Sequence, residues 1–185
     1  MQVASFVDGP RGRLFCSGFR QSRSSAAQRS FLLIPPFAEE MNKSRHVLAA
    51  MARALGDAGH EVLLPDLYGT GDSEGDFGDA TIDVWRGDLD AVAAQFGAER
   101  PLDIIGLRFG ALLGADLAKR RPTRSLVLLH PLGDGRQQVT QMLRLRLAAG
   151  LMGGSERETA AVLRERLAGG ETLEIAGYRI SAEMV

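Results

Sequence analysis

The 185-residue chain has a single cysteine, Cys16, and only three histidines. One cysteine cannot build an internal disulfide framework, and a lone thiol is typical of a reducing compartment. The apolar runs all fall well short of the roughly 18 residues needed to cross a bilayer. The first residues, MQVASFVDGPRGRLF, lack the basic start and apolar stretch of a signal peptide. We therefore expect a cytoplasmic protein without a membrane span.

Charge of one sign is also lacking, because the formal net charge is −1. A chain this close to neutral has no global field that would attract nucleic acid or an anionic membrane. The histidines, cysteine and carboxylates have no spacing typical of a metal site, and we expect neither a metal nor a cofactor. With 45% hydrophobic residues, the chain can bury the core of one soluble globular domain.

Apolar segments alternate with helical patterns along the first 130 residues. Two short apolar runs around the turn formers of residues 8–12 predict an opening β-hairpin over 3–7 and 14–19. Further strands are expected at 31–34, 61–64, 102–105 and 125–130, and helices at 44–58, 82–96 and 109–120. Thr81 is a candidate N-cap for the second of these helices. This alternation predicts a mostly parallel sheet with helices on both faces and an antiparallel hairpin at one edge.

The pattern changes after His130, and we divide the chain into a core (1–135) and a helical, cap-like or partial C-terminal segment (136–185). Residues 137–149 predict an amphipathic helix, and Ser155 opens a capping-box pattern for another helix that ends at 169–170. Residues 172–180 are strand-like. Ser181 resembles a helix cap four residues before the chain stops, which predicts truncation. Apolar residues of this segment either line an acyl pocket or pack an ordinary helix on the sheet: Met142, Leu143, Leu147, Leu151 and Met152.

The sequence LDIIGLRFGAL places a Gly-x-Arg-x-Gly turn, 106–110, between a strand and a helix. This is the context of a nucleophile elbow, G-x-S-x-G, whose glycines permit a close approach of backbone. A generic strand-to-helix turn with two glycines is the alternative. The loop DLYGTGDSEG, 66–75, strengthens the elbow interpretation, because it resembles the loop that follows the fourth strand of α/β-hydrolases. Its glycine spacing does not fit a dinucleotide-binding fingerprint.

Four segments together closely resemble one family across essentially the whole chain: PPFAEEMNKSR, DLYGTGDSEGDFGDAT, GLRFGALL and HPLGDGRQQVTQMLRLRLAA. The family is the second type of α/β-hydrolase-like protein associated with exosortase A systems, which sort PEP-CTERM proteins alongside exopolysaccharide production. The resemblance implies the α/β-hydrolase fold, with C-terminal strands missing from this chain. It also implies that the elbow arginine belongs to the family's own pattern.

A Ser-His-Asp triad is not expected, because Arg108 occupies the nucleophile position and no histidine follows His130. Arginine keeps its charge at physiological pH and cannot attack a carbonyl. It can bind an anion, or form an ion pair with Glu39 or Glu40. We therefore predict catalytic-site positions at Arg108, Glu39, Glu40 and His130. The predicted substrate-binding positions are Phe37, Ala38, Asn42, Lys43, Leu107 and Phe109, the last because its N–H opens a helix.

Other candidate nucleophiles and bases have simpler structural explanations. Ser73 is expected to hydrogen-bond its own turn, and Cys16 lies in the opening hairpin, away from the strand ends where sites assemble. His46 and His60 are expected at the surface or in packing contacts. His130 ends the sixth strand and is the best placed of the three histidines.

Two functions follow from these residues. The first is a hydrolase-like enzyme acting on an ester, thioester or acyl substrate in an exosortase system. The second is a catalytically degenerate accessory protein that binds an anionic ligand or partner in the elbow crevice. If strands beyond the sixth are missing, residues 125–130 form an exposed apolar sheet edge, which predicts a homodimer or other self-association.

Overall fold

The core of the protein is a six-stranded sheet. The computed structural model describes residues 1–20, 29–153 and 158–184. The strand order is β1-β2-β4-β3-β5-β6. The strands are β1 (Gln2–Asp8), β2 (Arg13–Phe19), β3 (Ser30–Ile34), β4 (Glu61–Pro65), β5 (Leu102–Leu107) and β6 (Thr123–Leu129). The β1–β2 hairpin pairs antiparallel with β4, and β4, β3, β5 and β6 are parallel. The predicted mostly parallel sheet with an N-terminal antiparallel hairpin is confirmed.

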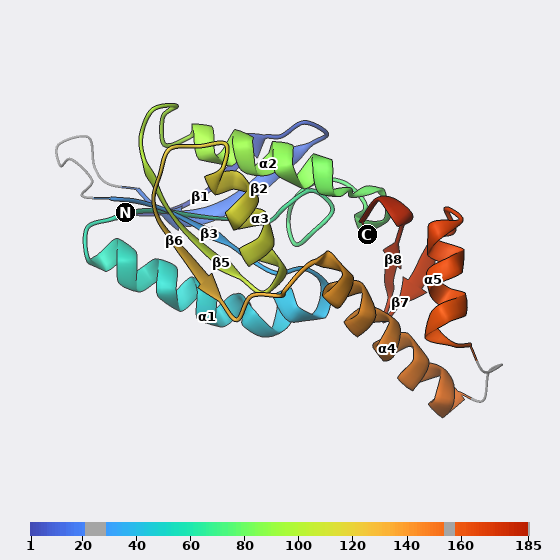
Figure 1. Ribbon diagram of the computed structural model, residues 1–185. Helices are drawn as coiled ribbons and strands as arrows, with labels where there is room; N and C mark the ends of the chain where they lie inside the picture. The colour runs from blue at the N-terminus through green and yellow to red at the C-terminus, as the bar shows by residue number, and fades with distance from the viewer. Residues whose placement is uncertain (21–28, 154–157, 185) are drawn as a thin grey trace.

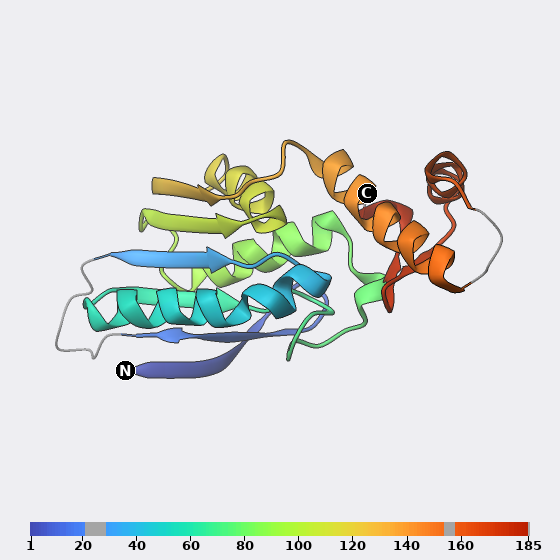
Figure 2. The ribbon, with the colours of Figure 1, turned by 90° about the horizontal axis from the view of Figure 1, so that it is seen from below.

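Helices cover both faces of the sheet. Helix α1 (Ala38–Asp57) lies on one face, and α2 (Ile82–Ala94) and α3 (Phe109–Ala118) lie on the other (Figures 1 and 2). Strand β3 is buried throughout, and its side chains alternate between two core clusters. Phe31 and Leu33 join the cluster that includes Leu48 of α1, whereas Leu32 and Ile34 join the cluster that includes α2 and α3. A strand buried on both faces has no polar side, which explains its continuous apolar sequence.

Helix α1 begins at Ala38, six residues before the start expected from the sequence. Apolar periodicity becomes visible only from Val47, so the sequence pattern does not reveal the first turns of the helix. Those turns carry Glu39 and Glu40, whose negative charges interact favourably with the positive end of the helix dipole. The predicted cap of α2 is present, since the Thr81 hydroxyl accepts a hydrogen bond from the Val84 N–H at 3.2 Å.

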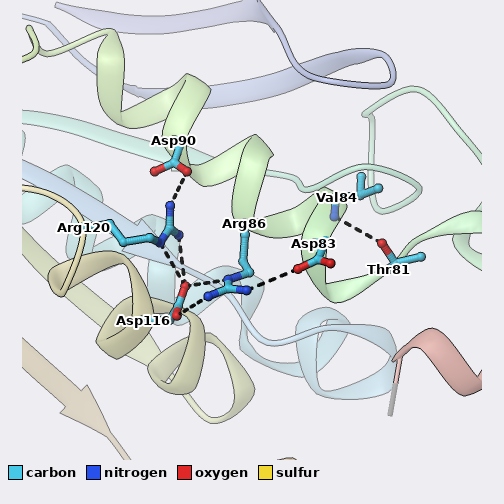
Figure 3. A network of polar contacts seen from close by, with 7 residues as sticks. All are labelled: Thr81, Asp83, Val84, Arg86, Asp90, Asp116 and Arg120. Carbon is cyan, nitrogen blue, oxygen red and sulfur yellow. Dashed lines mark hydrogen bonds and ion pairs between the residues drawn. The ribbon is translucent and has the colours of Figure 1, made fainter.

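A network of charged side chains ties α2 to α3 on the outer surface (Figure 3). Arg86 contacts Asp116 at 2.9 Å and Asp83 at 3.2 Å. Arg120 joins Asp116, at 3.0 Å, to Asp90. Single exposed pairs contribute little to stability, but here one aspartate serves two arginines from both helices. The network holds α3, whose first turn follows the Gly-x-Arg-x-Gly bend.

The C-terminal segment lies beyond the carboxyl ends of the parallel strands (Figures 1 and 2). It contains α4 (Gly135–Gly153), α5 (Ala160–Ala168), β7 (Leu173–Ile175), β8 (Tyr178–Ile180) and a 3₁₀ turn at Ala182–Met184. None of the described helices combines the length and apolar character that spanning a bilayer requires. The division into a core and a cap-like segment stays a prediction.

Two details of this segment differ from the sequence-based expectation. Ser155 lies outside the described residues, and the cap of α5 is Thr159, whose hydroxyl accepts a hydrogen bond from the Val162 N–H at 3.3 Å. The expected single strand over 172–180 is a short antiparallel hairpin. Ala176 and Gly177 have positive φ angles at the turn of this hairpin, and of these two residues only the glycine is a sequence signal for a turn.

Strand β6 forms an edge of the sheet with apolar residues exposed. Leu126, Val127 and Leu128 are 37%, 42% and 41% exposed, although they are consecutive and point to alternate faces. Neither face of this strand is therefore fully covered by the segment that follows it. Such an edge offers unpaired backbone groups and apolar surface to another strand.

We predict that this edge causes self-association, and that Val127→Lys reduces it by placing a charge on the edge. Sedimentation equilibrium should give a dimer or larger species for the unmodified chain and a shift toward monomer for the variant. Val47→Lys is the matched control, because Val47 is 46% exposed on α1 and lies away from the edge. A monomeric unmodified chain, or an equal shift for both variants, would contradict the prediction.

Candidate functional site

Arg108 lies in a sharp bend between β5 and α3. Its φ and ψ are 56° and −117°, and its N–H donates a hydrogen bond to the Leu129 carbonyl at 3.0 Å. Such backbone angles cost a non-glycine residue of order 1–3 kcal/mol. A Cβ on Gly106 would lie 2.4 Å from the Gly110 carbonyl oxygen, and one on Gly110 would lie 2.3 Å from the Ile34 carbonyl oxygen. The predicted tight strand-to-helix bend is confirmed, with glycines where backbone approaches closely.

The guanidinium of Arg108 is paired on one side. Its Nε donates to Oε1 of Glu40 at 3.0 Å, and its Nη2 lies 2.9 Å from the same oxygen. Nη2 also donates to Oε1 of Gln141, on α4, at 2.7 Å. The side chain of Arg108 is 16% exposed and that of Glu40 is 32% exposed. The ion pair expected with Glu39 or Glu40 is therefore present, and Glu40 is the partner.

A cavity of about 300 Å³ lies beside this ion pair. Its walls come from the start of α1, from α4 and from the β7–β8 hairpin. Five of the predicted site residues line it: Phe37, Ala38, Glu39, Glu40 and Lys43. Its other walls include two glutamines, one cation, several apolar side chains and one tyrosine: Gln138, Gln141, Arg144, Met142, Leu145, Ile175 and Tyr178.

The remaining predicted site residues lie outside the cavity wall. Arg108 is separated from the cavity by its two partners, which both line it. Phe109 is buried behind Phe37, with ring centroids 5.0 Å apart. Asn42 donates a hydrogen bond to the Tyr178 hydroxyl at 3.2 Å. His130 is exposed at the end of β6, so the structure does not bring it to the cavity. The functional roles predicted for these residues stay predictions.

Aromatic rings support the floor of the site. Phe37 packs against Trp85 and Phe77, with ring centroids 5.3 and 5.8 Å apart. Phe77 in turn packs edge-on against Tyr178, at 5.3 Å. Offset and edge-to-face arrangements of this kind are the favourable ones for aromatic pairs. The cluster joins the β7–β8 hairpin to the core, and so fixes the wall that Tyr178 contributes.

The loop after β4 is a structural support. The Ser73 hydroxyl donates to the Asp66 carbonyl at 2.6 Å and accepts from the Phe15 N–H at 2.8 Å. The predicted structural role of Ser73 is thus confirmed. Asp66 accepts hydrogen bonds from Arg45 and from the Asp72 N–H, each at 3.0 Å. Its burial nevertheless raises the pKa of this carboxyl.

The other candidate nucleophile and bases lie elsewhere. Cys16 is fully buried, and burial raises the pKa of its thiol to about 12, so it stays protonated near neutral pH. His46 is exposed on α1, and the His60 ring lies 5.1 Å from that of Phe31, as expected for surface and packing histidines. Among the described residues that line the cavity there is no serine, cysteine or histidine.

Solved structures place this architecture among known folds. An epoxide hydrolase from Vigna radiata matches with a TM-score of 0.54 and 21% identity over 69% of this chain. A protein from Agrobacterium vitis S4 designated a hydrolase matches with a TM-score of 0.56 and 21% identity over 82%. A CIB-like hydrolase from Thermoplasma acidophilum matches with a TM-score of 0.55 and 16% identity over 71%. The chain has the α/β-hydrolase fold.

The chain spans 39%, 60% and 63% of the lengths of these three proteins. No family model and no curated protein matches the sequence. At these identities the comparison establishes the fold, and function has to be argued from the site itself. In the α/β-hydrolase fold the nucleophile occupies the bend that follows the fifth strand, which is the position of Arg108 here.

The site residues that sequence reasoning did not find include Gln138, Gln141 and Tyr178. All three come from the segment after residue 135, whose place relative to the sheet no local pattern specifies. Gln141 lies on the face of α4 that meets Arg108. The path of the loop before α4 determines which residue of the helix reaches the arginine.

Proposed function

We propose that this protein is a catalytically degenerate member of an exosortase and PEP-CTERM system that binds a small ligand in the cavity beside the elbow. The observation that carries the proposal is Arg108 at the nucleophile position, paired with Glu40 and Gln141. An arginine cannot form an acyl-enzyme intermediate. The exosortase context rests on the resemblance of four sequence segments. A lone, buried Cys16 fits a cytoplasmic location.

The site has the backbone bend of a nucleophile elbow but carries an arginine there. The bend holds Arg108 at a strained backbone conformation, and a strain of order 1–3 kcal/mol persists only where surrounding structure fixes it. The arginine then orients Glu40 and Gln141 in the cavity wall. The cations that line the cavity are Lys43 and Arg144, both exposed at its rim. An anionic group of the ligand would meet these two residues, with Arg108 behind its two partners.

Hydrolysis of an ester, thioester or acyl group is the second candidate. It is favoured by the apolar part of the wall, where Met142, Leu145 and Ile175 could accept an acyl chain. The elbow backbone is also retained, although its nucleophile is not. This candidate requires a nucleophile or an activated water molecule at the cavity. Of the two acids in the wall, Glu40 is engaged with Arg108, which leaves Glu39 as the candidate base.

A chromogenic short-chain ester assay separates the two candidates. We expect the unmodified protein to release product no faster than a heat-denatured sample. We also expect no activity for Arg108→Ser, because a serine alone lacks the histidine base that activates it. Turnover by the unmodified protein at about 1 s⁻¹ or faster, within the usual range of enzymes, would refute the binding proposal.

A further inference from the structure

The cavity wall contains two hydrogen-bond acceptors without partners. Oε1 of Gln138 and Oε2 of Glu40 are buried, and neither has a hydrogen-bond partner among the described residues. Gln138 is only 6% exposed, and both residues line the same cavity. A buried acceptor left unpaired typically costs 1–3 kcal/mol, so most are satisfied in native proteins. Because both atoms belong to residues of one cavity wall, they are candidate acceptors for a ligand that supplies donors.

The charges around the cavity exclude a strongly cationic donor. Glu39 and Glu40 are balanced by Lys43 and Arg144, and Glu40 is further paired with Arg108. An ammonium group would meet one lysine and one arginine beside the two carboxylates, so it would gain no net electrostatic attraction. A hydroxyl group donates without carrying charge and also accepts from the lysine and arginine donors at the rim.

The remaining wall suits a ligand with both a polar and an apolar face. Tyr178 and Phe37 contribute aromatic surface, and Met142 contributes apolar surface to the same lining. The Tyr178 ring is held by its contacts with Phe77 and Asn42. The C–H face of a sugar ring packs on such a surface while its hydroxyls point to the acceptors. The volume of about 300 Å³ is at the lower end of ligand pockets.

We propose that the cavity binds a polyhydroxylated ligand, of the size of a monosaccharide, through hydroxyl donation to Gln138 and Glu40. This inference rests on the proposed binding function and specifies its ligand class. Arg108 is a positioning residue in this arrangement, because it holds the opposite carboxylate oxygen of Glu40. The hydroxyl groups could belong to a free sugar or to the headgroup of a glycolipid.

The test is binding of glucose, galactose, mannose and rhamnose, measured by isothermal titration calorimetry, with cyclohexanol as the hydroxyl-poor match. We expect at least one sugar to bind with a Kd of about 1–10 mM and at least about tenfold more tightly than cyclohexanol. Octyl glucoside, used below its micellar concentration, distinguishes the two sources. If it binds more tightly than glucose, the ligand is a glycolipid headgroup; if the two bind equally, the ligand is a free sugar. If no sugar binds, or if cyclohexanol binds equally, the inference is overturned.

The variant Gln138→Met separates a ligand role from a structural one. Removing an unpaired buried amide should raise the midpoint of thermal unfolding of the ligand-free protein, whereas sugar binding should weaken about tenfold. Gln95→Met, at an exposed position on α2's C-terminal cap, is the control and should change neither. A lowered unfolding midpoint with unchanged sugar affinity would overturn the inference. Ester turnover would instead refute the proposed function, so the two failures are distinguishable.

Discussion

Gly110→Ala is expected to lower the free energy of unfolding by at least about 3 kcal/mol. Replacing glycine by alanine inside a helix normally stabilises it by about 1 kcal/mol, so the sign is reversed here. The reason is that the added Cβ would lie 2.3 Å from the Ile34 carbonyl oxygen and 2.5 Å from that of Pro35. Both are backbone atoms of the turn that leads to α1, and they cannot move without displacing Phe37 and the cavity wall.

Urea denaturation of Gly110→Ala and of a control, Gly135→Ala, measures the effect. A Cβ on Gly135 would meet nothing within 4 Å, at the start of α4. The control should therefore be neutral or slightly stabilised by its helix propensity. Equal stabilities for the two variants would mean that α3 does not approach β3 as closely as described, and the elbow geometry would be wrong.

Asp88 gives the second large effect, a loss of stability as the pH rises. Its side chain is fully buried on α2, and burial raises the pKa of this carboxyl to about 6. One oxygen accepts a hydrogen bond from the Tyr68 N–H at 2.8 Å, and the other has no partner among the described residues. The folded protein binds the proton more tightly than the unfolded chain. Protonated Asp88 therefore contributes its full stabilisation below about pH 4, and this contribution is lost as the pH rises from about 4 through about 6.

The loss corresponds to about 3 kcal/mol for a shift of this size. Asp88→Asn removes the titrating group but keeps an oxygen for the Tyr68 N–H. The difference in unfolding free energy between pH 4.5 and pH 7.5 should therefore shrink by about 2–3 kcal/mol in the variant. Asp134→Asn, at an exposed position, should leave this difference unchanged. An unaltered pH dependence in Asp88→Asn would show that Asp88 is ionised and solvated in the folded protein.

Most of the core could be predicted from local sequence patterns. Buried strands such as β3 and β5 are mostly apolar. The Gly-x-Arg-x-Gly turn specifies its own geometry, because only glycine fits at positions 106 and 110. The Arg108–Glu40 pair followed from topology, since the carboxyl ends of adjacent parallel strands meet at one edge. These features depend on contacts that the fold class itself determines.

The full cavity wall could not be predicted, because it comes from segments far apart in the sequence; the sequence indicated its α1 side and Met142. Gln141 reaches Arg108 and Tyr178 reaches Asn42 only after α4 and the β7–β8 hairpin have packed over the sheet edge. Neither residue carries a motif. His130 ends a strand, a position that suggested a site residue, and its side chain is exposed in the structure; its predicted role stays a prediction.

Glu40 holds the Arg108 guanidinium behind the cavity wall, and the arginine Nε–H signals in a ¹⁵N NMR spectrum are a direct test of this pairing. The account predicts one slowly exchanging Nε–H, assigned by its loss in Arg108→Lys, that shifts and exchanges faster in Glu40→Gln. Glu39→Gln, one residue away, should leave that signal unchanged. An Arg108 Nε–H that exchanges as rapidly as those of exposed arginines, or that ignores Glu40→Gln, would contradict the account.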